Sequence, residues 1–328
     1  MEIINNDTIS FFITGGTGPF GMAFMRYLNN LNKNAIVFLL TRDIKSTNVK
    51  INEFDKIKIN LIEGQLPFVD KEIINDLPKV DYVLHMASVT ASESFHHIDP
   101  LYKYLLLAEG TLDICKYAVL VRAKRLLFTS SGAVYGSNSN GLPMKENAPL
   151  QVLDQSSVNN SLTVGKVSAE YICNYFREHT NLETKIARCF SFCGKDIPTN
   201  LHYAIGNFCE NAINGNDIII KGDGKAIRSY MDLDDLSNWI FNLLCFSSPS
   251  NIYNFGSDNE ISIYELATKI VSIVKSKSKI IVLGKSNHTL SNPKRNYYVP
   301  SLEKVYNELN LNMEYNIDQT IIRYINTI

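Results

Sequence analysis

Short apolar runs alternate with helix-like stretches through the first half of the chain. Runs that are apolar at nearly every position predict buried strands, and apolar positions that recur every three or four residues predict helices. The predicted strands are 10–14, 35–40, 57–64, 82–87, 125–131 and 184–190, and the predicted helices are 20–30, 101–120 and the segment around Lys166. Buried strands that alternate with helices are typical of a parallel sheet covered on both faces. We therefore predict an α/β fold with a doubly wound parallel sheet.

Beyond residue 190 this pattern changes. The loops are longer, the strands are short, and two further helices are predicted at 203–214 and 262–275. The change indicates a second, smaller lobe. We expect this lobe to be partly interleaved with the last strands of the sheet, and we place the boundary between residues 189 and 190.

The segment "TGGTGPFG" follows the first predicted strand directly and opens the first predicted helix. It spaces Gly15, Gly18 and Gly21 as Gly-x-x-Gly-x-x-Gly. Residues without a Cβ atom allow backbone N–H groups to approach a pyrophosphate at the N-terminus of a helix. The order of strand, loop and helix makes the pattern specific. Residues 1–189 are therefore predicted to form a dinucleotide-binding Rossmann domain, and residues 190–328 mainly a substrate-binding lobe.

The end of the second strand bears on the choice of cofactor. In NAD-binding domains an acidic residue there binds the ribose 2′-hydroxyl. Here Thr41 holds that position, Arg42 follows it, and Asp43 comes two positions late, so we expect the Asp43 side chain to point elsewhere. A guanidinium suits a 2′-phosphate through charge-assisted hydrogen bonds. The sequence thus favours NADP over NAD; the alternative is NAD with a solvated Arg42.

Composition and charge argue against several kinds of partner. The chain has a formal net charge of −1, whereas proteins that bind nucleic acid normally carry a basic excess. No run of about 18 apolar residues and no signal peptide is found, so no membrane partner is predicted. Six scattered cysteines complete no metal site. We expect reduced, buried thiols in a cytoplasmic protein.

Four further segments carry a resemblance to a known family. They are "LHMAS" (84–88), "SSGAVYG" (130–136), "GDGKAIRSYMDLDDL" (222–236) and "YNFGSD" (253–258). With the glycine loop, they make the chain resemble the extended short-chain dehydrogenase/reductases, specifically their nucleotide-sugar epimerase/dehydratase group. The resemblance extends over nearly the whole chain.

This resemblance implies roles for individual residues. Ser131 would be the active serine, which donates to a sugar oxygen where negative charge develops. Arg228 would bind the pyrophosphate of a nucleotide sugar. Arg295, in "NPKRNYY", would be either a second clamp or a surface charge. His85 and Ala87 would line the cofactor, with His85 in a structural rather than an acid/base role.

The family's Tyr-x-x-x-Lys pair is incomplete in this chain. Lys166 matches the lysine that holds the nicotinamide ribose and lowers the pKa of the tyrosine, which is ordinarily about 10. One helical turn separates the two residues, so both side chains face the substrate. Leu162 stands where the tyrosine is expected, and no tyrosine lies between Tyr135 and Tyr171. We expect Tyr135 itself to pack rather than react.

A second polar position has also become apolar, because Leu107 stands where the family has an asparagine before Gly-Thr. Several groups are candidates to replace the missing phenol. A histidine would suit neutral pH, whereas serine and threonine hydroxyls are poor bases. The candidates are Ser161, Thr163, Lys166 itself, His96 and His97.

The resemblance leaves two functions open. Gly132 and Ala133 occupy the places of the Asp-Glu pair of sugar 4,6-dehydratases, so this reaction is disfavoured, and decarboxylation with it. The first hypothesis is an NAD(P)-dependent nucleotide-sugar epimerase or 4-ketoreductase in polysaccharide biosynthesis. The second, which Leu162 and Leu107 favour, is a catalytically silent sensor or partner subunit that binds NADP(H) or a nucleotide sugar. The resemblance also implies a homodimer, built through a four-helix bundle of residues 101–118 and 165–179.

Overall fold

The computed structural model describes residues 8–31, 34–89, 98–136, 138, 141–150, 157–200, 203–246, 248–284 and 297–328. The chain divides into two compact units. The first comprises residues 1–134, 153–188 and 237–253, and the second comprises residues 135–152, 189–236 and 254–328. Two segments thus depart from a division at residue 189: residues 135–152 belong to the second unit, and residues 237–253 belong to the first.

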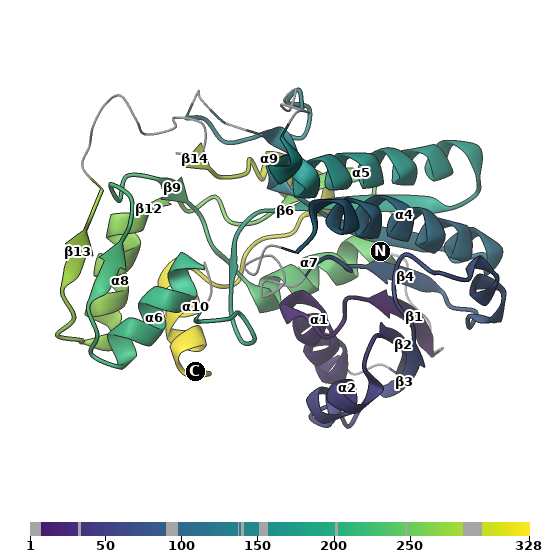
Figure 1. Cartoon of the computed structure of the whole chain (residues 1–328), viewed down its shortest axis with the longest axis horizontal. Helices are drawn as coiled ribbons and strands as arrows, with labels where there is room; N and C mark the ends of the chain where they lie inside the picture. The colour runs from purple at the N-terminus through teal and green to yellow at the C-terminus, as the bar shows by residue number, and fades with distance from the viewer. Residues whose placement is uncertain are drawn as a thin grey trace. The chain divides into compact units, whose positions relative to one another are not determined.

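The first unit is built on a seven-stranded sheet in the order β11-β6-β5-β4-β1-β2-β3 (Figure 1). Its strands are β1 (Ile9–Thr14), β2 (Ala35–Thr41), β3 (Lys58–Glu63), β4 (Tyr82–His85), β5 (Arg125–Ser131), β6 (Glu183–Cys189) and β11 (Ile252–Phe255). β1 pairs in parallel with both β2 and β4, and the parallel pairing continues to β3 and β5. The strand order reverses direction at β1, and ligands of such sheets bind at the carboxyl ends of the strands beside that point.

Helices cover both faces of this sheet. They are α1 (Pro19–Asn30), α2 (Ile44–Ile51), α4 (Pro100–Leu120), α5 (Ser161–His179) and α7 (Leu233–Cys245), with short 3₁₀ turns η1 (Lys71–Asp76), η2 (Gly132–Tyr135) and η3 (Val158–Asn160). On one face, Phe11 of β1 meets Phe24 of α1 edge to face at 5.7 Å. On the other face, a buried cluster joins the sheet to α4 and α5. The predicted doubly wound α/β fold is confirmed.

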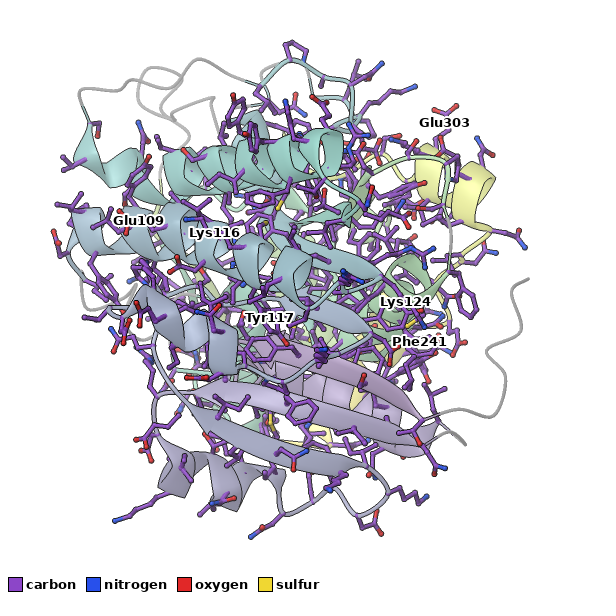
Figure 2. The ribbon with its side chains drawn as sticks, turned by 90° about the vertical axis from the view of Figure 1, so that its right-hand side faces the viewer. Glu109, Lys116, Tyr117, Lys124, Phe241 and Glu303 are labelled. Atoms are coloured by element: carbon purple, nitrogen blue, oxygen red, sulfur yellow. The ribbon has the colours of Figure 1, made fainter. Side chains whose placement is uncertain are left out.

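Tyr117 illustrates how α4 is held to the sheet. Its ring centroid lies 4.6 Å from that of Phe12, and its hydroxyl donates to the Pro78 carbonyl oxygen at 2.6 Å. Figure 2 shows Tyr117 between the helix and the sheet, with Glu109 and Lys116 on the same helix. Glu109 and Lys116 are exposed, whereas Tyr117 is fully buried. The apolar stripe of α4 is thus anchored at both a ring contact and a hydrogen bond.

The second unit consists of short strands and helices. Its helices are α6 (Ala204–Ile213), α8 (Ile263–Val274), α9 (Glu303–Leu309) and α10 (Ile317–Ile325), and α7 begins in it. Its strands are β7 (Phe192–Cys193), β8 (Ile218–Ile220), β9 (Ile227–Arg228), β10 (Met231–Asp232), β12 (Ile261–Ser262), β13 (Ile280–Val282) and β14 (Tyr297–Tyr298). α6 and α8 match the two helices predicted beyond residue 190. In the part of the chain that the structure describes, no helix is both long and apolar enough to span a bilayer.

Candidate active site

The glycine loop lies between β1 and α1 and is shaped by close backbone approaches. Gly15 has φ of +72°, and a Cβ atom there would come within 2.7 Å of the Ala87 backbone nitrogen. A Cβ atom on Gly21 would lie 2.2 Å from the Gly16 Cα atom. Gly18 is the N-cap of α1 and has no side chain to bond the first amide groups of the helix. The loop is therefore a cradle that side chains would fill, and it fits a pyrophosphate at the helix N-terminus.

The carboxyl end of β2 leads directly into α2. Asp43 is the N-cap of α2 and accepts a hydrogen bond from the Ser46 backbone N–H at 3.0 Å. The expectation that Asp43 points elsewhere is thus confirmed. Arg42 is exposed beside it. Lys50, from the last turn of α2, reaches the glycine loop, where its ammonium lies 3.4 Å from the Thr17 carbonyl oxygen. Sequence reasoning did not identify Lys50.

His85 ends β4 in a chain of buried hydrogen bonds. Its Nδ1 lies 2.7 Å from Thr14 Oγ1, and its Nε2 lies 3.0 Å from Thr111 Oγ1. Thr111 donates its proton to the Leu107 carbonyl, so its oxygen accepts from His85 Nε2–H. Thr14 in turn accepts from the Ala87 backbone N–H and donates to Nδ1. This order of donors assigns the neutral Nε2–H tautomer.

The electrostatics of His85 agree with that tautomer. Complete burial, and to a smaller extent the positive charge of Lys166, lowers the pKa of His85 to about 3. Both ring nitrogens are occupied by threonine hydroxyls. The ring therefore links β1, β4 and α4 and holds Ala87 in place, as expected for a structural residue.

Ser131 ends β5, and Lys166 bonds the same strand two residues earlier. Lys166, on α5, is buried and donates to the Thr129 carbonyl oxygen at 2.6 Å. Its ammonium also lies 4.6 Å from the centre of the Phe128 ring. Ser131, two residues after Thr129, accepts the Ala133 backbone N–H at 3.1 Å. That bond uses the serine oxygen as an acceptor, so the hydroxyl proton is still there to donate.

A buried ion pair supports this end of β5 from α5. Glu170 lies one turn beyond Lys166 and receives Arg188 Nε at 3.0 Å and Nη2 at 2.7 Å. It also accepts the Ser130 hydroxyl at 2.5 Å. The two charged side chains are each about 5% exposed. Glu170 thus ties Ser130, the neighbour of Ser131, to the lysine helix. Sequence reasoning assigned no role to Glu170 or Arg188.

The two leucines in place of polar residues lie on facing helices. Leu107 is fully buried, and a Cβ atom on Gly165 would come within 2.8 Å of Leu107 Cδ1. Leu162 lies three residues before Gly165, in the same turn of α5, and is half-buried. Ser161 and Thr163 flank it in the first turn of that helix. His96 and His97 lie outside the described residues.

The remaining predicted residues belong to the second unit. Arg228 is half-buried in β9, where its guanidinium donates to the Ile227 carbonyl oxygen at 2.7 Å and lies 5.9 Å from the Tyr298 ring. Tyr135 is buried and donates to Asn254 at 2.6 Å, in agreement with a packing role. Arg295 lies outside the described residues.

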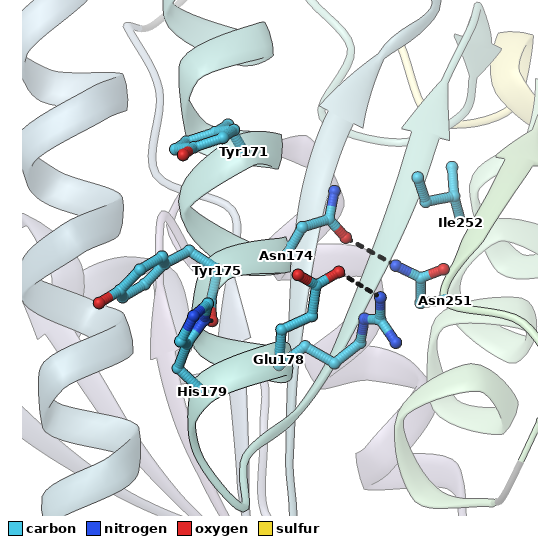
Figure 3. Close-up of a pocket in the computed structure, with 8 residues that line it drawn as sticks. Tyr171, Asn174, Tyr175, Glu178, His179, Asn251 and Ile252 are labelled. Carbon is cyan, nitrogen blue, oxygen red and sulfur yellow. Dashed lines mark hydrogen bonds and ion pairs between the residues drawn. The ribbon is translucent and has the colours of Figure 1, made fainter.

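A surface pocket on the first unit is separate from these residues. It encloses about 470 Å³ along the second half of α5 and the start of β11 (Figure 3). Its lining is Tyr171, Asn174, Tyr175, Arg177, Glu178, His179, Asn251 and Ile252. The Tyr175 and His179 rings stack with centroids 4.3 Å apart, and Asn251 donates to Asn174 at 2.7 Å. None of the predicted site residues lines this pocket.

Comparison with known proteins gives a consistent match. The model of the NAD dependent epimerase/dehydratase family matches residues 11–256. A dTDP-D-glucose 4,6-dehydratase from Dictyostelium discoideum is 27% identical over 287 residues, which cover 80% of this chain and 61% of that protein. The chain therefore spans less than two thirds of that relative. The expectation that disfavours 4,6-dehydration thus has no support from the comparisons, and it depends on Gly132 and Ala133 alone.

Two solved structures share the fold at low sequence identity. A UDP-N-acetylglucosamine 4-epimerase from Methanobrevibacter ruminantium, in complex with UDP-N-acetylmuramic acid, has a TM-score of 0.82 at 19% identity, covering 98% of both chains. A Thermus thermophilus UDP-glucose 4-epimerase in complex with NAD has a TM-score of 0.79 at 16% identity, covering 97% of this chain and 98% of that one. At these identities the likeness is one of fold.

Proposed function

Because the chain belongs to the NAD-dependent epimerase/dehydratase family, we propose that it is a nucleotide-sugar oxidoreductase acting as an epimerase or a 4-ketoreductase. One observation carries the proposal. Lys166 is bonded to the Thr129 carbonyl two residues before Ser131, and Ser131 is the last residue of β5, which supports a shared site at this end of the strand. A buried lysine and a strand-end serine in this arrangement suit proton transfer and oxyanion stabilisation at a sugar carbon.

The cofactor would lie along the same edge of the sheet. The cradle of Gly15, Gly18 and Gly21 suits the pyrophosphate, and Lys166 suits the nicotinamide ribose. Ala87, held by Thr14, would line the cofactor beside the neutral His85. A bound nicotinamide supplies the hydride acceptor for the sugar carbon. Ser131 would then donate its remaining proton to the sugar oxygen as charge develops.

We favour NADP over NAD within this proposal. Arg42 follows β2 where a 2′-phosphate would sit, and the carboxylate of the next residue, Asp43, is occupied in capping α2. Lys50 adds a second cation beside the glycine loop. The Thermus thermophilus epimerase of the same fold was solved in complex with NAD. NAD is therefore the alternative cofactor, and a binding measurement must distinguish it from NADP.

The substrate in this proposal is a nucleotide sugar. Arg228 would pair with its diphosphate through charge-assisted hydrogen bonds, with Arg295 as a candidate second clamp. Gly132 and Ala133 bring no carboxylate to the site, so we favour epimerisation or ketoreduction over 4,6-dehydration. The product would be consumed in polysaccharide synthesis.

Assembly and location are part of the proposal. Leu101 of α4 is 62% exposed, and Tyr171 and Tyr175 of α5 are 72% and 49% exposed. Apolar and aromatic side chains on this helix pair support a homodimer through a four-helix bundle. The six cysteines are all buried and none of them forms a disulfide in the structure, which supports a reducing compartment such as the cytoplasm.

A silent binding protein is the second candidate. Leu162 removes the phenol, and Leu107 fills the neighbouring position with a buried side chain. A protein with this site could hold NADP(H) or a nucleotide sugar as a sensor or partner subunit without turnover. The intact Ser131 and Lys166 favour the enzyme.

The test separates these two functions. Purified protein is incubated with NADP⁺ or NAD⁺ and with UDP-glucose, UDP-N-acetylglucosamine or dTDP-glucose, while absorbance at 340 nm and product NMR spectra are followed. We expect turnover that Ser131→Ala lowers by about a hundredfold or more. Ser248→Ala is the control, because that hydroxyl bonds the nearby Ser250 carbonyl in a loop. Cofactor binding without turnover would support the silent protein instead.

A further inference from the structure

Helices α4 and α5 lie side by side (Figures 1 and 3). Two pairs of residues define how the helices are aligned. Leu107 of α4 lies against Gly165 of α5. Two turns further on, the buried side chains of Cys115 and Cys173 belong to the same core cluster and lie close together. In both pairs the α5 residue comes 58 positions after its α4 partner (107 to 165, 115 to 173). The helices therefore run parallel with a constant offset.

The same offset places Tyr104 of α4 level with Leu162 of α5. Tyr104 precedes Cys115 by 11 residues, and Leu162 precedes Cys173 by 11 residues. Because about 3.6 residues make a helical turn, 11 residues are close to three full turns. Tyr104 therefore shares the side of α4 from which Cys115 meets α5. Leu162 likewise shares the side of α5 that meets α4.

Two further observations fit this alignment. α4 contacts η3, the turn that leads directly into α5 at Ser161. Tyr104 and Leu162 are both half-buried. No described residue hydrogen-bonds to the Tyr104 hydroxyl. The phenol therefore lies at the end of the helix pair from which Lys166 also projects, one turn into α5.

We propose that Tyr104 supplies from α4 the phenol that Leu162 does not supply from α5, and that it is the proton acceptor of the reaction. The inference rests on the proposed oxidoreductase function. A bound oxidised nicotinamide would supply the acceptor for the hydride of the sugar C–H bond, which would take both electrons of that bond. The hydroxyl proton of the same carbon passes to the Tyr104 phenolate, and a C=O bond forms. In the reverse step the Tyr104 phenol returns that proton.

The neighbouring tyrosine offers a matched control. Tyr102 lies on another side of α4, where its hydroxyl accepts a hydrogen bond from Gln65 at 3.3 Å and its ring packs on the core. His85 is no competitor, because both of its ring nitrogens are engaged by threonines. Ser161 and Thr163 carry only hydroxyls, which are weak bases.

The activity test uses the full chain with NADP⁺ or NAD⁺ and the same three sugar nucleotides. We expect Tyr104→Phe to lower the turnover rate by about 10²- to 10⁴-fold, while cofactor affinity stays within about twofold and Tyr102→Phe keeps the wild-type rate. The double variant Tyr104→Phe/Leu162→Tyr should have a turnover rate at least ten times that of Tyr104→Phe alone. A structural role of the Tyr104 hydroxyl would not be rescued from the other helix.

The alignment itself is tested without turnover. Mild oxidation of Tyr104→Cys/Leu162→Cys should give a disulfide between the two introduced thiols, detected by peptide mass mapping. Tyr102→Cys/Leu162→Cys should give none, because those side chains diverge. Absence of the first disulfide, or equal yields from both variants, overturns the alignment.

The outcomes separate this inference from the proposed function. If the wild-type protein turns over a sugar nucleotide and Tyr104→Phe does so equally fast, the role of Tyr104 is overturned and the function stands. If the wild type turns over none of them, the proposed function fails, and the role of Tyr104 fails with it. Loss in Tyr104→Phe with recovery through Leu162→Tyr supports both.

Discussion

Leu107 of α4 packs against Gly165 of α5 so closely that a Cβ atom on the glycine would lie 2.8 Å from Leu107 Cδ1 and 3.0 Å from its Cβ. Leu107 is fully buried. The family pattern has an asparagine at this position, which would need hydrogen-bond partners in the same space. The leucine and the glycine thus form an apolar seam directly beside Leu162 and Lys166.

This seam predicts the effect of adding one methyl group. Gly165→Ala should lower the free energy of unfolding by about 1–3 kcal/mol, because the new Cβ atom overpacks against Leu107. Urea unfolding followed by circular dichroism measures the change. Gly222→Ala is the control, since a Cβ atom there would meet nothing within 4 Å. Leu107→Ala should remove most of the penalty in the double variant. An equal loss with and without Leu107 would contradict the contact.

His85 predicts a specific dependence of stability on pH. Its folded pKa is lowered to about 3 from an ordinary value of 6.5. The unfolded chain therefore binds this proton first, so stability falls as pH decreases below 6.5, by up to about 1.4 kcal/mol per pH unit. Urea unfolding at pH 7, 6 and 5 should show that His85→Asn lacks this component. The variant should be less stable at pH 7, and the two curves should converge toward pH 5. Parallel curves would show that the pKa of His85 is not lowered in the fold, because its folded and unfolded states would then bind this proton equally.

Arg42 predicts the choice between the two nicotinamide cofactors. Arg42→Ala should weaken NADP⁺ binding by about ten- to a hundredfold, the loss of a charge-assisted contact to the 2′-phosphate. NAD⁺ binding should stay within about twofold. Calorimetric titration with both cofactors measures this change in affinity. Lys58→Ala is the control, because Lys58 lies at the amino end of β3, whereas Arg42 follows the carboxyl end of the neighbouring strand β2. Equal losses for both cofactors would assign Arg42 to another role, and no loss for either would assign it to solvent.

Local signals were sufficient for most of the sheet. β5 occupies residues 125–131 as predicted, and α4 begins one residue earlier than predicted. These elements carry long apolar runs, and α4 also has Asp99 as its N-cap followed by a proline. The short α2 and η1 were missed, because their polar sequences show neither period clearly. α2 depends on the Asp43 cap, which a search for apolar positions does not see.

The site could be predicted only where its residues lie in one motif. Gly15, Ser131 and Lys166 were found in this way. The partners that hold them come from distant segments, such as Arg188 on Glu170 and Thr111 on His85. The equal spacing of 11 residues in both helices was visible in the sequence. Its meaning required the packing of Leu107 against Gly165 and of Cys115 and Cys173 in one buried cluster, which only the fold provides.

The buried Glu170–Arg188 ion pair predicts a measurable contribution to the free energy of unfolding. Glu170→Gln keeps the shape of the side chain but removes the negative charge that pairs with the buried Arg188, so the free energy of unfolding should fall by about 3–5 kcal/mol. The matched control is Glu178→Gln on the same helix, whose partner Arg177 is 3.3 Å away with side chains 61% and 40% exposed. That exposed pair should contribute less than about 1 kcal/mol.

Urea unfolding of both variants decides the point. Glu170→Leu/Arg188→Met should recover much of the stability that Glu170→Gln loses, because it removes both charges and refills the volume. It should not recover turnover, since Ser130 loses the acceptor that lies 2.5 Å from its hydroxyl, next to Ser131. Equal stability of Glu170→Gln and Glu178→Gln would mean that water reaches Arg188. A fully active double variant would mean that Ser131 is held by β5 alone.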